Sequence, residues 1–553
     1  MALSGGYDFS QLFHASTLSY SPGSTFIATI HGRRLIVRST ATLAIVRTFQ
    51  CLGGAVSTSR QNDWLSIDQL LWSADSLYIM AFSAKAMTAW VFGLTDEGHG
   101  EGGEVARIGG EGVEGLMRVE WGRGGREVLA WSDHGIKLSI WDLSSGHAAY
   151  IQHPKSLSTH SFSSDSRYLA VAEKHQSKDF VGVYDSESGY SLLRHFPVAT
   201  ADLAGLTWSP CGRFIAVYDS ILTYALHIYS PLGPLVHSFS PASPSFSLLS
   251  ASEDPGLGVR CATWAPNGRW IALGGWDGKV RVVESESGRC VASMSWMART
   301  VERNTTVWRE PSEWLKETRG RGIVQFNRTT GVTPLPSVRP DLTRSPPRSG
   351  ITQMAFDLEG SLLLVRVETQ PNVVHIHTFL PNPTAPSPEI SHLAALVFAE
   401  QVKTARWCSG RRKLAVSTKG GAVYFWDGDG GWVEDGGWAD GDEEIRGGLM
   451  EGVGVPTLGE FSATDAAWSP DGNSLAILDR ANAQFCVLYD DPPAEESTHA
   501  PATPRRWDGH EGLTHVSEGD EEDDRSVLTS LAEAEALWTW HGRTAGGGLR
   551  GGA

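Results

Sequence analysis

A short pattern recurs along the 553-residue chain: an aromatic residue, a tight turn and an apolar run. It reads "WSPCGRFIAVYD" from Trp208, and it returns as "WAPNGRWIALGG" from Trp264 and "WSPDGNSLAILD" from Trp468. Self-similarity at roughly fifty residues is typical of proteins built from stacked structural repeats. Nine candidate units share the pattern, beginning near Leu18, Gln69, Arg118, Thr159, Leu206, Cys261, Met354, Thr404 and Ala466.

The turn in each unit has a simple chemical basis. In the stretch 209–212, Ser suits the first position of a type I turn, Pro sets φ at the second, and Gly suits the fourth. The runs that follow these turns, such as "FIAV" and "WIAL", are almost continuously apolar. Strands of this kind are covered on both faces, so we expect each small sheet to lie between two neighbouring sheets.

A further strand follows each apolar run at a regular distance, and two of these strands end in Trp141-Asp142 and Trp426-Asp427. Units of this length and pattern are typical of WD40 β-propeller blades. The sequence therefore predicts an all-β, WD40-type β-propeller with about nine degenerate repeat units. These units could close one large ring, or seven to eight blades could close with the remaining units outside the ring.

The repeats set the expected domain boundaries. The propeller is predicted over residues 7–490, with inserted loops at 98–115, 298–350 and 428–454. Residues 491–553 form a polar, acidic C-terminal tail that we expect to be largely disordered, as we expect of the loops.

Charge and cysteine content narrow the expected partners and compartment. The formal net charge of −17 would repel nucleic acid and anionic lipid, so neither is expected as a partner. The six cysteines are scattered with no CxxC pair, which favours reduced thiols in the cytosol or nucleus. The first residues lack a secretory signal and no apolar run is long enough to span a bilayer, so we expect a soluble intracellular protein.

The chain contains no recognisable catalytic motif. A GxSxG elbow, a Walker loop and an HExxH sequence are all missing, so we predict a protein that is not an enzyme and has no catalytic, cofactor or metal site. His375 and His377 share one strand face and could in principle hold one metal ion. No cysteine or third histidine falls at a supporting spacing, and a structural zinc site needs four ligands. We interpret both as ordinary strand histidines.

Three blocks are more distinctive than a generic blade: "AEKHQSKDFV" at 172–181, "LLRHF" at 192–196 and "DLAGLTWSP" at 202–210. With them, and with gaps from Tyr7 to Asp490, the chain resembles a fungal member of the WD repeat-containing protein 8 family. The resemblance implies a non-enzymatic adaptor that binds a coiled-coil spindle-anchoring protein. It further implies that the chain helps to tether microtubule minus ends at the spindle pole body or centrosome, within the cytoplasmic cytoskeleton. Contact with the γ-tubulin complex, and in some fungi with a minus-end-directed kinesin, is expected to be indirect.

The sequence also suggests a partner-binding site. The stretch "KHQSKDF" lies between two expected strands, where Lys174, His175, Lys178 and Asp179 would gather in one exposed loop. A charged loop on a rigid frame suits contact with a coiled coil. A well-capped hairpin without any partner is an equally good interpretation.

Two other functions stay open on the sequence alone. An RNA- or chromatin-associated propeller scaffold would need a continuous basic face. A propeller enzyme would need residues from several blades to meet in the central channel.

Overall fold

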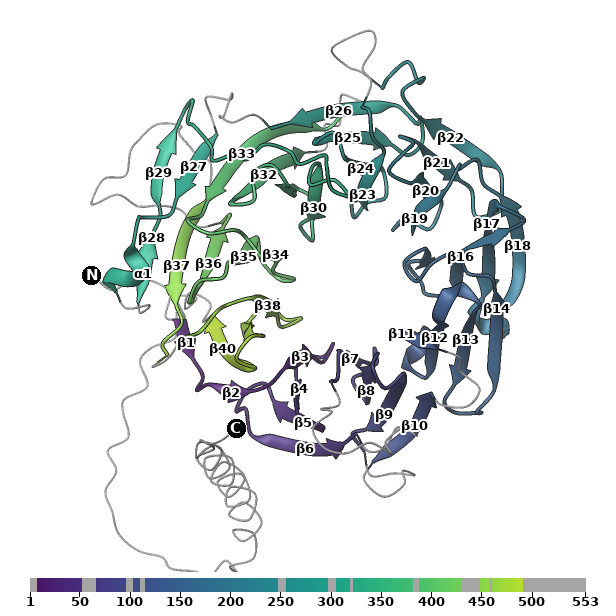
Figure 1. Cartoon of the computed structure of the whole chain (residues 1–553), viewed down its shortest axis with the longest axis horizontal. Coiled ribbons are helices and arrows are strands. Elements are labelled where there is room, and N and C mark those ends of the chain that lie inside the picture. Colours follow the sequence, from purple (N-terminus) through teal and green to yellow (C-terminus); the bar gives the residue numbers. More distant parts are fainter. Residues whose placement is uncertain are drawn as a thin grey trace, which may run out of the picture. The chain divides into compact units, whose positions relative to one another are not determined.

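Nine separate sheets stand side by side in a ring, each with its first strand innermost (Figure 1). This computed structural model describes residues 7–51, 66–95, 103–109, 115–246, 255–296, 305–318, 322–380, 387–429, 448–457 and 460–490. The chain divides into a unit of Met1–Pro493, which holds the ring, and a second unit of Ala494–Ala553, which lies outside the described residues. The predicted tail therefore falls outside the described residues from 491 onward.

The first five blades follow one another along the chain, and each has four antiparallel strands. Blade 1 has β3 (Thr17–Tyr20), β4 (Phe26–His31), β5 (Arg34–Ser39) and β6 (Ile45–Gln50). Blade 2 has β7 (Gln69–Trp72), β8 (Tyr78–Ser83), β9 (Thr88–Gly93) and β10 (Glu104–Gly109). Blade 3 has β11 (Leu116–Trp121), β12 (Glu127–Ser132), β13 (Lys137–Asp142) and β14 (Ala148–Gln152). Blade 4 has β15 (His160–Phe162), β16 (Tyr168–His175), β17 (Lys178–Asp185) and β18 (Ser191–Pro197). Blade 5 has β19 (Leu203–Trp208), β20 (Ile215–Asp219), β21 (Leu226–Tyr229) and β22 (Leu235–Phe239).

The last four blades include three with added strands. Blade 6 has β23 (Val259–Trp264), β24 (Trp270–Gly275), β25 (Lys279–Glu284) and β26 (Cys290–Ser295). Blade 7 has β30 (Ile351–Phe356), β31 (Leu362–Val367), β32 (Val373–Leu380) and β33 (Glu389–Val397), extended by β27 (Thr306–Arg309) and β29 (Asn327–Thr330). Blade 8 has β34 (Thr404–Trp407), β35 (Lys413–Ser417), β36 (Ala422–Asp427) and β37 (Leu449–Gly454), extended by β28 (Ile323–Gln325). Blade 9 has β38 (Asp465–Trp468), β39 (Ser474–Asp479) and β40 (Gln484–Asp490), with β1 (Tyr7–Phe9) and β2 (Phe13–His14) paired to β40.

The helices are short. The described ones are α1 (Trp314–Glu317) and the 3₁₀ turns η1 (Arg123–Gly125), η2 (Asp133–Gly135) and η3 (Ser186–Ser188). None of them has the length or the apolar character that crossing a bilayer requires.

The hydrophobic core lies between the blades. Separate clusters of buried side chains fill each of the nine junctions, including the junction of blade 9 with blade 1, where Phe485 and Val487 meet Tyr20 and Ile27. Each blade thus buries both of its faces, as the continuous apolar runs predicted. The expectation of a single ring of nine blades is confirmed, and the alternative of a smaller ring with extra units is wrong.

The repeated turn and the repeated tryptophan have separate structural roles. In the turn at 209–212, Gly212 N–H donates to Ser209 O at 2.9 Å, and Gly212 has the positive φ of 73° that glycine adopts without strain. The indole N–H of Trp72 donates to Ser19 O at 3.0 Å, across the junction of blades 1 and 2. The same bond from one innermost strand to the next is made by Trp121, Trp407 and Trp468, to Leu71, Ala355 and Arg406.

Both ends of the described propeller meet in blade 9, where β1 forms a strand outside β40 (Figure 1). Tyr7 pairs with Asp490 in the register and stacks on Phe425 of blade 8, with ring centroids 5.2 Å apart. Its hydroxyl donates to the Glu451 carboxylate of β37. The N-terminal strand therefore holds blade 9 to blade 8.

Three predicted loops contain strands. Within 98–115, β10 completes blade 2, and within 428–454, β37 completes blade 8. Within 298–350, β27 runs parallel to β33 and β28 pairs with β37, so this insertion adds strands to the outer edges of two blades. The expectation that these segments are only loops is wrong for those strands. In 98–115 and 428–454, Gly- and acid-rich flanks hid the short strands β10 and β37, and in 298–350 the strands form by pairing with the edges of blades 7 and 8. The remaining parts at 98–102, 110–114, 298–304, 319–321 and 430–447 lie outside the described residues.

Candidate functional site

The predicted partner-binding residues lie on a hairpin of blade 4, between β16 and β17. Each strand has eight residues, two more than β12 and β13 of blade 3. Only Gln176 and Ser177 form the turn, and both have positive φ, 48° and 67°, as in the tight two-residue turns that suit the twist of a β-hairpin. We call residues 174–179 the fourth-blade hairpin.

The four predicted residues occupy strand ends and not a loop. Lys174 pairs with Asp179 in the register, and His175 pairs with Lys178. Lys174 and Lys178 are exposed, and the His175 side chain is 36% exposed. Asp179 is buried at 3% exposure, so its expected place in an exposed loop is wrong.

Hydrogen bonds explain why Asp179 is buried. Its carboxylate accepts from Lys155 Nζ with both oxygens at 2.8 Å, from Leu203 N–H at 2.6 Å and from Thr200 Oγ1 at 3.1 Å. Lys155 belongs to the connection from β14 to β15, while Thr200 belongs to the connection from β18 to β19. Asp179 therefore holds the β14–β15 and β18–β19 connections against the fourth-blade hairpin. A buried carboxylate whose oxygens accept this many hydrogen bonds has a structural role.

A second ion pair extends this network to the surface. Lys155 Nζ also lies 2.7 Å from the Asp202 carboxylate, and Lys174 Nζ lies 3.6 Å from it. The hydrogen bond from Lys155 lowers the pKa of the Asp202 carboxyl, and the charges of both lysines add to this effect. The amino group of Lys174 is thus partly neutralised, which makes Lys178 the more available cation of the two.

Three other side chains of blade 4 converge on the face that carries His175. Glu173 Oε2 lies 2.9 Å from His175 Nε2 and 3.2 Å from His195 Nε2, and Tyr184 Oη donates to Glu173 Oε1 at 2.5 Å. Glu173, His175 and His195 form the His–Glu cluster. Within the described part of the chain, it is the one group of three or more His, Cys, Asp or Glu side chains whose ligand atoms all lie within 4.8 Å of one another.

The sequence analysis named His175 and missed Glu173 and His195. Glu173 and His175 are two positions apart on one strand and so share a face, which was a readable signal. His195 stands opposite Gly182 on the adjacent strand β18, and only the strand register brings it into place.

A group of three buried histidines lies in blade 7. His375 Nδ1 is 3.1 Å from His392 Nε2, His377 stacks on His392 with ring centroids 4.6 Å apart, and His375 Nε2 is 2.6 Å from Gln370 Oε1. Burial lowers the pKa of all three imidazoles, to about 4 for His392, and their mutual proximity lowers the pKa of His375 and His377 further. The third histidine, His392, comes from β33, and the spacing of the other two could not reveal it. We call His375, His377 and His392 the buried histidine group, and they pack as neutral rings.

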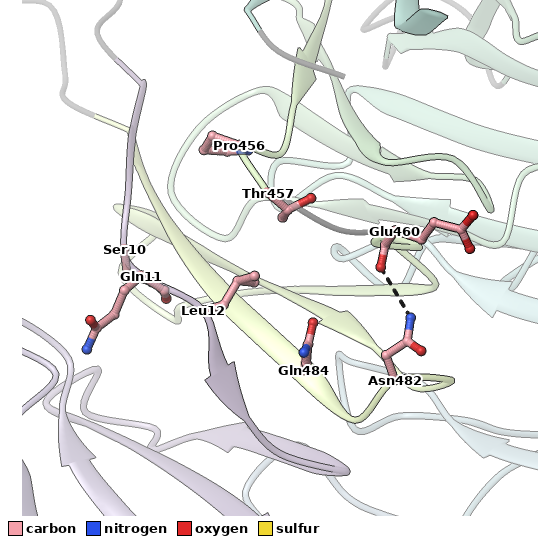
Figure 2. A pocket seen from close by; sticks show the side chains of 8 residues that line it. All are labelled: Ser10, Gln11, Leu12, Pro456, Thr457, Glu460, Asn482 and Gln484. Atoms are coloured by element: carbon pink, nitrogen blue, oxygen red, sulfur yellow. Dashed lines mark hydrogen bonds between the residues drawn. The ribbon is translucent and has the colours of Figure 1, made fainter. Parts of the chain in front are cut away.

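A cavity of about 620 Å³ lies beside β40 (Figure 2). Figure 2 shows that it is bordered by the β1–β2 connection, by the connection that follows β37 and by the β39–β40 hairpin, with Asn482 Nδ2 donating to Glu460 O at 3.3 Å. Glu460 is the one carboxylate among the described lining residues, which offer no imidazole or thiol beside it. The lining residues are Ser10, Gln11, Leu12, Pro456, Thr457, Glu460, Asn482 and Gln484.

Comparisons with known proteins identify a homologue of the chain. Mouse WD repeat-containing protein WRAP73 is 26% identical over 504 residues, which cover 87% of this chain and 96% of that protein. The chain is a homologue of WRAP73 in the WD40 propeller family. WD repeat-containing protein 8 is another name of WRAP73, so the resemblance to that family is confirmed.

Other proteins also match this WRAP73 homologue. An uncharacterized WD repeat-containing protein of Schizosaccharomyces pombe is 24% identical over 161 residues, 29% of this chain and 31% of that one. Residues 246–309 match the model of the anaphase-promoting complex subunit 4 WD40 domain. Among solved structures, the Myceliophteria thermophila Cps50 (Swd1) propeller is 9% identical with a TM-score of 0.37, covering 88% of this chain and 99% of that one. The C-terminal WD40 domain of Sif2 is 11% identical with a TM-score of 0.43, covering 87% and 98%.

WD40 propellers are generally non-catalytic scaffolds, and homology to WRAP73 over almost its whole length implies a scaffold role for this chain. The geometry agrees with that role. A ring of packed blades holds its hairpins and connections rigidly, so that surface residues from several blades are presented in fixed positions.

Proposed function

We propose that this WRAP73 homologue is a non-enzymatic scaffold that binds a coiled-coil spindle-anchoring protein and helps to tether microtubule minus ends at the spindle pole body or centrosome. The match to almost the whole of WRAP73 carries the proposal. The γ-tubulin complex and a minus-end-directed kinesin are reached through the coiled-coil partner, because an acidic chain with a net charge of −17 would meet the acidic tubulin surface unfavourably.

The partner contacts the fourth-blade hairpin through its exposed cations. Lys174 and Lys178 are exposed, while the buried Asp179 anchors the hairpin beneath them. Acidic side chains on the surface of a coiled coil would complement these two lysines, and rim charges of this kind chiefly speed association and set its dependence on salt. In this arrangement His175 and Asp179 position the hairpin, and Lys174 and Lys178 touch the partner.

Recovery of bound proteins from dividing cells tests both parts of the proposal. The tagged full chain is used at two salt concentrations, beside Lys174→Ala/Lys178→Ala and a control, Arg33→Ala/Arg34→Ala. The control removes the same charge from the exposed β4–β5 hairpin of blade 1. We expect a coiled-coil spindle-anchoring protein with γ-tubulin components from the unaltered chain and the control, and less from the lysine variant.

The other outcomes separate the alternatives. Equal recovery of the coiled-coil partner from all three proteins would support the scaffold role. It would also show that the fourth-blade hairpin is not part of the contact surface. Recovery chiefly of ribonucleoproteins or chromatin that high salt releases would overturn the spindle-pole proposal in favour of an RNA- or chromatin-associated scaffold.

A further inference from the structure

The His–Glu cluster has the composition of a metal site. Imidazole nitrogens with one carboxylate oxygen suit zinc and neighbouring transition metals, whereas Mg²⁺ and Ca²⁺ prefer oxygen ligands alone. Two histidines with one glutamate is a set that zinc uses where a fourth position stays open to water. Glu173 and His175 come from β16 and His195 from β18, so rigid strands place all three ligands.

The distances fit a metal of this size. Zinc bonds to nitrogen and oxygen are about 2.0–2.2 Å, so the ligand atoms of a tetrahedral site lie about 3.4 Å apart. In the cluster, Glu173 Oε2 lies 2.9 Å from one imidazole nitrogen and 3.2 Å from the other. A spread of a few tenths of an ångström would bring these two distances to the tetrahedral value, and the two imidazole nitrogens lie within 4.8 Å of each other. The two imidazoles are 36% and 32% exposed, so solvent reaches both rings.

Neighbouring groups hold the ligands in place. Tyr184 donates to Glu173 Oε1, which leaves Oε2 directed at the histidines. Phe180 stacks on His195 with ring centroids 4.8 Å apart and planes 1° apart. Supporting contacts of this kind orient the ligands of known metal sites.

A glycine provides the space for the carboxylate. A Cβ atom at Gly182 would lie 2.3 Å from Glu173 Oε1 and 2.7 Å from the Tyr184 ring, closer than real contacts allow. Gly182 stands opposite His195 in the register, in the middle of a strand where glycine is otherwise unfavourable. Because Gly182 has no side chain, the Glu173 carboxylate, the Tyr184 ring and the facing His195 imidazole have room on this side of the sheet.

We propose that Glu173, His175 and His195 bind one divalent transition-metal ion, with Zn²⁺ as the occupant that this donor set favours and water in the remaining position. The simpler arrangement, a histidine–carboxylate pair, is already seen between blades 3 and 4, where His160 Nε2 of β15 lies 2.7 Å from Glu120 Oε2 of β11. The blade 4 cluster differs by the second imidazole on the same oxygen. The proposal is independent of the spindle-pole function.

Calorimetric titration with ZnCl₂ tests the proposal on the tag-free full chain after removal of metals with EDTA. We expect one zinc ion per chain, much weaker binding of Mg²⁺ and Ca²⁺, and a visible ligand-field spectrum when Co²⁺ is added instead. His175→Ala and His195→Ala should each weaken zinc binding at least tenfold, on the scale that the loss of even a supporting contact produces. His147→Ala, which removes an exposed histidine of the β13–β14 turn, is the control and should leave it unchanged.

Two results would overturn the proposal. One is a titration of the unaltered chain that shows no stoichiometric zinc binding. The other is zinc binding that the His175 and His195 variants leave intact. Should either variant unfold, the Co²⁺ spectrum of the unaltered chain decides, because its absence denies imidazole ligation without any substitution.

Discussion

Lys155 Nζ lies 2.8 Å from both carboxylate oxygens of Asp179, and this ion pair joins the blade 3–blade 4 connection to the fourth-blade hairpin. The two side chains are 10% and 2% exposed. A pair so removed from water contributes little net stability compared with an apolar replacement of both partners. Loss of Asp179 is costly, because Leu203 N–H loses its acceptor and the buried Lys155 amino group keeps only the half-exposed Asp202 as a partner.

Asp179→Ala should therefore lower the free energy of unfolding by about 3–5 kcal/mol. Lys178→Ala, an exposed change on the same hairpin, should alter it by less than about 0.5 kcal/mol. Urea unfolding followed by tryptophan fluorescence measures both. An Asp179→Ala protein of normal stability that fails to bind the partner would instead give Asp179 a direct role in recognition.

The indole hydrogen bonds between blades should be measurable one by one. Trp72→Phe removes the bond to Ser19 O, whereas Trp264 has the same place in its repeat, and its Nε1 is buried with no hydrogen-bond partner among the described residues. Both side chains are 8% exposed, so the apolar losses are matched. We expect Trp72→Phe to cost about 1 kcal/mol more than Trp264→Phe in urea unfolding. Equal losses would mean that packing alone joins the blades.

The buried histidine group should make the propeller sensitive to acid. The folded-state pKa values of His375, His377 and His392 lie below the unfolded value, so the unfolded chain binds more protons at mildly acidic pH. The contribution of these neutral histidines to the free energy of unfolding is fully present above the unfolded pKa of about 6.5. It is lost as the pH falls from there toward about 4. Each histidine contributes at most about 1.4 kcal/mol per pH unit.

His377→Phe isolates one of these contributions, since it keeps a ring against Trp296 and removes a buried nitrogen, Nε2, that has no hydrogen-bond partner among the described residues. We expect a shallower loss of stability between about pH 6.5 and 4, from urea unfolding at a series of pH values. His147→Ala, which removes an exposed histidine outside the buried group, is the control. A slope unaffected by His377→Phe would assign the acid sensitivity to other groups.

The sequence was sufficient to predict the ring, because the constraint that builds it is local. A turn such as 209–212 and the apolar strand after it are contiguous, and a strand apolar on both faces can only lie between two sheets. The strands β10 and β37 were missed for the opposite reason: glycine- and acid-rich flanks set the composition of their segments, while pairing with β9 and β36 makes them strands.

The candidate site was only partly predictable for a similar reason. Alternation along β16 places Glu173 beside His175, but His195 joins them through the register of β17 with β18. Asp179 carried a charge that suggested exposure, and its burial depends on Lys155 and Thr200 from the connections on either side of blade 4. Contacts between segments distant in sequence leave no local pattern to read.

Blade 9, which closes the ring, should be the blade that substitutions destabilise most easily, because it takes strands from both ends of the described propeller. Tyr7 contacts Phe425 and Glu451 of blade 8, so Tyr7→Ala removes an aromatic stack and a hydrogen bond together. We expect a loss of about 2–4 kcal/mol and faster hydrogen exchange along β40, which then loses its outer partner. Tyr7→Phe keeps the stack and should cost only about 1 kcal/mol. Gln11→Ala, an exposed change in the β1–β2 connection, is the control, and exchange of β40 that all three variants leave unchanged would show that β1 does not hold the ring closed.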